Sequence, residues 1–266
     1  MAAQNAVGKV TRDTQDSSAK LAAGERIIRA ADDAAGLAIS EKFKAEIRSS
    51  RQANRNANDG ISLVQVAEGG LSETASLLVR MRELSMQAAT DTLMDSDRDK
   101  ASLEYEHIKQ ELERISRSTE YNGKKLLNGS GNELNFQVGV GADSEDDHIT
   151  FNASKFNSGV DSLGVSSATI TSKYGAQQSL GMVDGALSKL GSQRALLGSI
   201  QNRLNTSSNN LGVYTENMAQ ANSRIRDLDY AEETSRMARN QIVGQASTAM
   251  LAQANSSPKT VLKLIE

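Results

Sequence analysis

The 266-residue sequence contains no cysteine, no tryptophan and only 3% aromatic residues, so it lacks the large side chains that usually fill a thick globular core. Its single proline, Pro258, leaves residues 1–257 without the residue that interrupts helices, and the lack of cysteine excludes disulfides, thiolate metal sites and cysteine nucleophiles. Charges of both signs are interspersed at a formal net charge of -3, which favours neither a nucleic-acid partner nor insertion into a membrane.

Small residues dominate the first predicted helix, residues 5–23. Val7 and Val10 give it a weakly apolar face, and Gly24 is a plausible helix stop. Residues 231–256, near the other end of the chain, have the same character. Isolated helices with so little apolar surface are marginal, so we expect both segments to be loose in the monomer and ordered only on assembly.

The following segment carries two runs of apolar residues at helical spacing. The second run covers residues 101–115, and residues 90–95 predict a turn between two antiparallel helices. Ser96, with Asp99 three residues later, resembles a capping box, so the second helix is predicted to begin near residue 97. The first run is marked by Ile61, Val64, Leu71 and Leu78.

Period-two alternation replaces the helical spacing in the middle of the chain. Leu134 and Phe136 alternate with polar neighbours, and so do Ile149 and Phe151. The acidic stretch at residues 143–147 lies between the two runs. This pattern predicts a β-hairpin, in a region too short to be a large independent domain.

The last third of the chain has the most regular periodicity. A second apolar row follows the main row three residues later, interrupted by Gln193 and Ser207, and sustained 3-4 spacing is typical of a coiled-coil seam. An ordinary amphipathic helix of a bundle is the alternative. We predict a mainly α fold, a long antiparallel helical rod with coiled-coil-like packing of N- and C-terminal helices and a small β-hairpin region. The main row is Val183, Leu190, Leu197, Leu204, Leu211, Met218 and Ile225.

No constellation of residues in the sequence supports catalysis. His107 lies among glutamates without a second histidine, so a solvated helix face explains it better than a metal site. His148 follows two aspartates at the predicted hairpin turn, and the acidic stretch lacks the calcium-loop spacing. Gly139 and Gly141 lie inside a strand-like run and do not open a helix, so they form no phosphate loop. We therefore predict no enzyme, no cofactor and no metal.

Short motifs near both ends of the chain are distinctive. In order and register they resemble bacterial flagellin, the subunit of the flagellar filament, over most of the chain. The motifs are RAADDAAGLAIS at 29–40, RNANDGIS at 55–62, YNGKKLL at 121–127, SRIRDLDYAEET at 223–234 and AMLAQAN at 249–255.

The resemblance implies an architecture and a location. Flagellins pair their terminal helices in an inner core and again in an outer helical layer. They leave the cell through the flagellar export channel without a cleaved signal peptide, so the expected location is the extracellular filament. The expected partners are further copies of the chain, other flagellins, the export apparatus, an export chaperone, the filament cap and host flagellin receptors. The implied segments are 1–33 and 223–266 for the inner core, 34–127 and 175–222 for the outer helices, and 128–174 for the hairpin region.

The resemblance also suggests roles for particular residues. Arg80, Leu84 and Glu104 match positions that the flagellin-sensing Toll-like receptor contacts, although packing within or between subunits is the alternative reading of all three. At the C-terminus, the apolar segment that chaperones and cytosolic sensors engage in the family corresponds to Val261, Leu262 and Leu264.

The sequence departs from the family at its start. It opens on a segment that resembles a point inside the family's first helix, so either this start is natural or a first segment is missing, and polymerisation strength is in question. Two alternative functions remain. A junction protein between hook and filament shares the terminal helices, and an enzyme carried on a flagellin scaffold would need a catalytic motif within residues 128–174.

Overall fold

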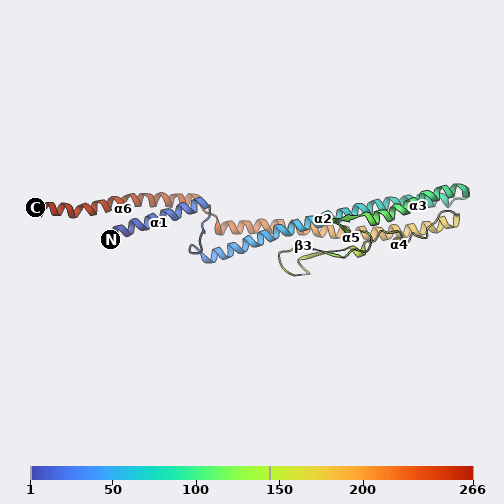
Figure 1. The fold of residues 1–266 in the computed structure, drawn as a ribbon, viewed down its shortest axis with the longest axis horizontal. Helices are drawn as coiled ribbons and strands as arrows, with labels where there is room; N and C mark the ends of the chain where they lie inside the picture. The colour runs from blue at the N-terminus through green and yellow to red at the C-terminus, as the bar shows by residue number, and fades with distance from the viewer. Residues whose placement is uncertain (1, 144, 266) are drawn as a thin grey trace. The chain divides into compact units, whose positions relative to one another are not determined.

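The computed structural model describes the backbone of residues 2–143 and 145–265 and the side chains of residues 4–143 and 145–254. The predicted fold class, mainly α with a small β region in the middle, is confirmed (Figure 1). The helices are α1 (Ala2–Ala23), α2 (Ala34–Ala88), α3 (Asp95–Ser118), α4 (Val160–Leu163), α5 (Lys173–Arg226) and α6 (Tyr230–Ile265). Between α3 and α4 lie β1 (Glu120–Tyr121), β2 (Lys124–Lys125), β3 (Glu133–Gln137), β4 (His148–Asn152) and the 3₁₀ helix η1 (Ala153–Lys155).

Contacts divide the chain into two compact units. Residues 1–48 and 216–266 form one, which we call the terminal unit, and residues 49–215 form the other, the central unit. The long helices α2 and α5 contribute to both units. The predicted segment boundary at 33/34 coincides with the start of α2, whereas the contacts divide the chain later, so the five-segment division stays a prediction.

In the central unit, α2 and α5 run antiparallel. Ser50 near one end of α2 bonds to Thr215 at 2.8 Å, while Arg82 near the other end pairs with Asp184 at 2.7 Å. Helix α3 lies alongside both (Figure 1) and contributes Tyr105, Ile108 and Leu112 to a shared apolar core. Because the 3-4 spacing places one row of apolar side chains on the facing side of each helix, this core follows from the periodicity of the sequence.

The turn between α2 and α3 differs from the prediction. Helix α3 begins at Asp95 with Met94 as its N-cap residue, and no side chain caps it, so the predicted capping box at Ser96 and Asp99 is wrong. The buried Arg98 joins the turn to the helices: it donates from Nη1 to Asp95 at 2.6 Å, and also to two backbone carbonyls at the end of α2 and in the turn. These tertiary bonds hold the turn without a hydroxyl cap.

Two antiparallel hairpins follow α3. The first turns through Asn122 and Gly123, both at positive φ, as a tight two-residue turn requires. The second is the predicted hairpin, with Leu134 opposite Phe151 and Phe136 opposite Ile149. Alternation places Ile149 and Phe151 on the face that packs against the helical core, which confirms the predicted pattern.

The terminal unit contains α1 packed alongside α6 (Figure 1). Helix α1 ends before Gly24, which has φ +70° and donates its amide to Lys20 O at 2.9 Å, so the predicted helix stop is confirmed. Much of what this pair buries is polar, including Ser17 and Glu233. Among the described residues, no helix is both long and apolar enough to cross a bilayer.

Candidate functional site

The predicted seam lies inside the subunit. Its members in the central unit are buried, except for Ile61, which is half-buried. The two members in the terminal unit, Met218 and Ile225, are half-buried as well. These side chains stabilise one chain, and their role between chains stays a prediction. The buried members are Val64, Leu71, Leu78, Val183, Leu190, Leu197, Leu204 and Leu211.

Helix α6 presents an apolar face that no described residue of the terminal unit covers. Ile242 is 66% exposed and Met250 is 71% exposed, and Val243 is exposed between them. Their spacing of one, seven and eight residues puts them on one side of the helix. A single partner helix covers only one stripe of α6, so the pairing with α1 leaves this face open. We call Ile242, Val243 and Met250 the α6 apolar face.

A second apolar patch lies on the outer side of α2 in the central unit. Val79 and Met86 are both exposed, and their spacing of seven residues places them on the same face of the helix. With Arg82, Glu83 and neighbouring residues they line a shallow groove of about 590 Å³. Exposed apolar side chains grouped with charges at their rim are typical of surfaces that meet another protein.

The three candidate receptor contacts do not share one surface. Arg80 and Glu104 are exposed and bonded to each other, Nε to Oε1 at 2.8 Å, and Arg80 also bonds to Glu83 at 2.9 Å. The bond to Glu104 is the main reason that the pKa of Arg80 is raised. Leu84 is only 2% exposed and belongs to the core, so no partner reaches its side chain in this conformation.

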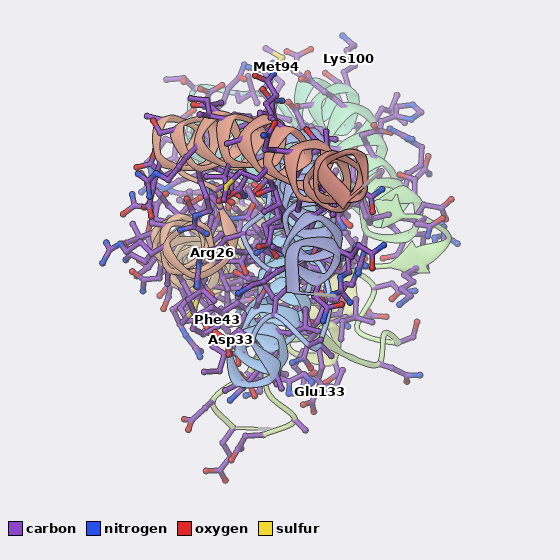
Figure 2. All side chains as sticks on the ribbon, turned by 90° about the vertical axis from the view of Figure 1, so that its left-hand side faces the viewer. Arg26, Asp33, Phe43, Met94, Lys100 and Glu133 are labelled. Atoms are coloured by element: carbon purple, nitrogen blue, oxygen red, sulfur yellow. The ribbon has the colours of Figure 1, made fainter. Side chains whose placement is uncertain are left out.

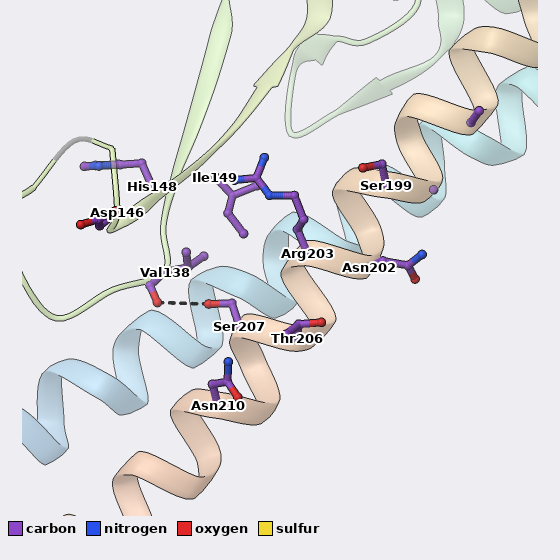
Figure 3. Close-up of a pocket in the computed structure, with 12 residues that line it drawn as sticks. Val138, Asp146, His148, Ile149, Ser199, Asn202, Arg203, Thr206, Ser207 and Asn210 are labelled. Carbon is purple, nitrogen blue, oxygen red and sulfur yellow. Dashed lines mark hydrogen bonds between the residues drawn. The ribbon is translucent and has the colours of Figure 1, made fainter.

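A polar groove of about 780 Å³ separates the β3–β4 hairpin from α5 (Figure 3). Ser207 Oγ donates to Val138 O at 3.4 Å across its floor, and Arg203 is an exposed cation on its α5 side. Sequence reasoning did not predict this groove. A row of polar residues at helical spacing opposite the seam was the available signal: Ser199, Asn202, Arg203, Thr206 and Asn210.

The acidic hairpin turn uses its carboxylates within the loop. Asp147 Oδ2 accepts the amide of Asp143 at 3.0 Å, and Asp143 Oδ1 accepts the amide of Glu145 at 2.9 Å. Within the described residues, no group of three or more histidine or acidic side chains is arranged to hold a metal. The side chains of the candidate chaperone segment, Val261, Leu262 and Leu264, lie outside those that the structure describes.

Two family models match the helical regions at either end of the chain. Residues 1–132 match the bacterial flagellin N-terminal helical region, and residues 180–265 match the bacterial flagellin C-terminal helical region. The middle segment between the two matches contains the β3–β4 hairpin. The paired N- and C-terminal helices of the structure are therefore the parts that the family shares.

Curated relatives match along almost the whole chain. A flagellin of Halalkalibacterium halodurans is 41% identical over 94% of this chain and 91% of its own length. A flagellin of Bacillus subtilis is 40% identical over 100% of this chain and 98% of its own. A flagellar filament 33 kDa core protein of Treponema phagedenis is 38% identical over 100% and 96%.

Solved structures agree with these relatives. A flagellin from Bacillus cereus superposes with a TM-score of 0.53 at 29% identity, covering 63% of this chain and 94% of its own. A putative flagellar hook-associated protein from Vibrio parahaemolyticus reaches 0.60 at 14% identity, covering 74% and 100%, and at that identity it shows the fold alone. With the sequence matches along its full length, the chain belongs to the bacterial flagellin family.

Proposed function

We propose that this chain is a structural subunit that polymerises with copies of itself into the bacterial flagellar filament used for swimming. The observation that carries the proposal is the 40% identity to a flagellin across the full length of both chains. The family is one of structural proteins, and we expect no catalytic activity.

The open α6 apolar face gives the polymer a physical reason to form. Burying one large apolar side chain stabilises an association by about 1.5–3 kcal/mol, and the face offers Ile242, Val243 and Met250 together. A subunit that joins its neighbours through two different surfaces builds a ring if the rotation between subunits closes, and an open helical array if it does not. Repeated copies of α1 and α6 would then cover one another.

Location and further partners are part of the proposal. Family membership supports an extracellular filament, and we infer export through the flagellar channel without a cleaved signal. An export chaperone, the filament cap and host flagellin receptors are the other partners we propose. The lack of cysteine supports passage as an unfolded chain, because no disulfide has to form or break on the way.

Electron microscopy of the seeded, purified full chain tests polymerisation. We expect long filaments from the unaltered chain and none from Ile242→Asp with Met250→Asp, because two charges cannot enter an apolar contact. Ile242→Val with Met250→Leu is the matched control at the same positions and should polymerise. Far-UV circular dichroism of the monomers should be the same for all three, since both side chains are exposed.

Two outcomes would count against the proposal. Short layers that stop growing would favour a junction protein between hook and filament. Filaments of the aspartate variant at the same critical concentration as the unaltered chain would remove the α6 apolar face from the assembly contact.

A further inference from the structure

The terminal unit has two connections between helices, and these connections lie side by side. Residues 24–33 connect α1 to α2, and residues 227–229 connect α5 to α6. The two connections are joined as a short antiparallel bridge: Arg26 N donates to Arg226 O at 2.7 Å, and Leu228 N donates to Gly24 O at 3.1 Å. Each connection therefore constrains the other.

The side chain of Arg226 joins three segments at this point. Its Nε lies 2.9 Å from Glu25 Oε2 in the α1–α2 connection, and its Nη1 lies 2.7 Å from Glu41 Oε1 on α2. The same Nη1 is 3.3 Å from Ser40 Oγ. Only 13% of the Arg226 side chain is exposed, whereas Glu25 is 32% and Glu41 is 58% exposed, so water reaches the carboxylates of both pairs.

Arg26 makes the reciprocal contact. Its Nη2 donates to Ile225 O, at the end of α5, at a distance of 2.7 Å. Arg26 is labelled in Figure 2. Ile27, which follows it, is almost fully buried, and no space remains for a side chain at Gly36 beside it. Ile27 thus anchors the connection to α2 by an apolar contact, while the connection to α5 and α6 is held by polar bonds.

We propose that Glu25, Ser40, Glu41 and Arg226 form an ionic latch that fixes the orientation of the α1–α6 pair relative to the first turns of α2, and that acid releases it. We call these four residues the Arg226 latch. When Glu41 loses its charge, its ion pair with Arg226 is lost and the guanidinium becomes free to point into water. The backbone bridge and the bond from Arg26 Nη2 to Ile225 O then remain as polar ties between the two connections, and the helix pair gains freedom to swing.

Charged groups around the latch set its pH range. On α2, Lys44 lies 3.6 Å from Glu41; on the α5 side, Asp227 accepts from Ser223. On the other side, Lys20 of α1 lies 4.0 Å from Asp32, which accepts hydrogen bonds from the amides of residues 28 and 29.

The hydrogen bond from Arg226 is the main reason that the pKa of Glu41 is lowered. A lowered carboxyl pKa stabilises the latch above the ordinary value of about 4.3, and this contribution is lost as the pH falls through the lowered pKa.

The lack of cysteine makes the latch testable by paired spin labels on the full-length monomer. Cysteines introduced at Lys42 on α2 and Arg239 on α6, both exposed, carry the labels, and electron paramagnetic resonance measures the distance between them. We expect a narrow distribution at pH 7 that broadens below about pH 4, where glutamate becomes protonated. Arg226→Met should broaden the distribution already at pH 7, and the amides of Arg26 and Leu228 should exchange about tenfold faster.

Three further variants test whether loss of the Arg226 latch, rather than a general loss of stability, broadens the distance distribution. Arg12→Met, which removes an exposed arginine bonded to Gly8 O of its own helix, is the matched control and should leave the distribution narrow. Asp32→Asn tests whether the neighbouring carboxylate causes the acid response. Glu25→Gln with Glu41→Gln keeps Arg226 and should give a broad distribution that no longer depends on pH.

An unchanged distribution in Arg226→Met at pH 7 would overturn the proposal. So would an acid response that persists in the double glutamine variant, or one that Asp32→Asn abolishes. If Arg226→Met loses helicity by circular dichroism, the double glutamine variant decides the question. None of these measurements requires a filament, so the latch can fail while the proposed function stands.

Discussion

Arg98 lies at the turn between α2 and α3, where Nε donates to Ala88 O at 2.9 Å and Nη2 donates to Thr90 O at 2.7 Å. Arg98 is 6% exposed and Ala88 is fully buried, so water does not readily replace the arginine at the Ala88 carbonyl, whereas Thr90 is exposed. The turn also carries Met94, which is exposed and labelled in Figure 2. Arg98 therefore satisfies the Ala88 carbonyl at the end of α2, and Thr90 Oγ1 donates to Gln87 O in the same turn of the helix.

Arg98→Met should lower the free energy of unfolding by about 2–3 kcal/mol, because it leaves the carbonyl of buried Ala88 without its charged donor. Urea unfolding followed by circular dichroism measures this change. Lys100→Met is the control: Lys100 is exposed, and its pair with Asp97 should contribute within about 0.5 kcal/mol. Equal losses in the two variants would mean that Arg98 does not hold the turn.

Asp91, in the same turn, gives a prediction for pH. The hydrogen bond from Lys173 Nζ at 2.7 Å is the main reason that the pKa of Asp91 is lowered. The contact thus contributes above the ordinary aspartate value of about 3.9 and is lost as the pH falls through the lowered pKa. Lys173→Met should return the pKa of Asp91 to its ordinary range, as followed by NMR titration. No change in that titration would mean that the pair does not persist in solution.

At the scale of elements, the buried residues of the seam pack α2 against α5 in the central unit. Leu204 is fully buried between α2 and α5 and also lies close to Gly60, where its Cδ1 would be 3.2 Å from an added Cβ. So tight a fit leaves little room for neighbours to collapse into a vacated space. The seam is therefore sensitive to the loss of single methyl groups.

Leu204→Ala should destabilise the central unit by about 2–5 kcal/mol, the range for a large-to-small change that leaves a cavity. Val213→Ala on the same helix removes an exposed side chain and should change stability by less than about 0.5 kcal/mol. The midpoint of urea unfolding measures both. A small effect at Leu204 would show that the helices repack around the gap.

Periodicity predicted the elements better than it predicted their junctions. Seam residues and the alternation of Leu134, Phe136, Ile149 and Phe151 follow from local spacing of 3-4 and of two, so a single sequence contains them, whereas the register of the hairpin was not predicted. The capping box failed because Ser96 offered a hydroxyl that the turn does not use, while Arg98 bonds across the turn to α2. The Arg226 latch joins residues about two hundred positions apart, and no local pattern indicates such a contact.

At the scale of the whole molecule, the two units differ in how they are stabilised. The central unit has a continuous apolar core drawn from α2, α3 and α5, whereas the α1–α6 pair buries polar groups and exposes Ile242 and Met250. A pair of helices with few buried apolar side chains opens locally at little cost. Order in the terminal helices is therefore expected to come from neighbouring subunits.

Hydrogen exchange of monomer and filament should show this difference. Amides of residues 5–20 and 235–254 should exchange quickly in the monomer and at least about 100-fold more slowly in the filament, where neighbouring copies cover the helices. Amides of the seam, such as Leu197, should be protected in both states and provide the internal control. Strong protection of residues 5–20 in the monomer would contradict the expectation.

The burial of Leu84 limits how far this region can change during evolution. Its side chain fills the core directly beneath the surface that carries Arg80 and Glu104. A substitution at the surface pair costs little stability, but one at Leu84 would open a cavity in the fold. A binding partner can depend on the local surface shape that Leu84 sets. Such a partner recognises a feature that the protein cannot readily change without losing stability.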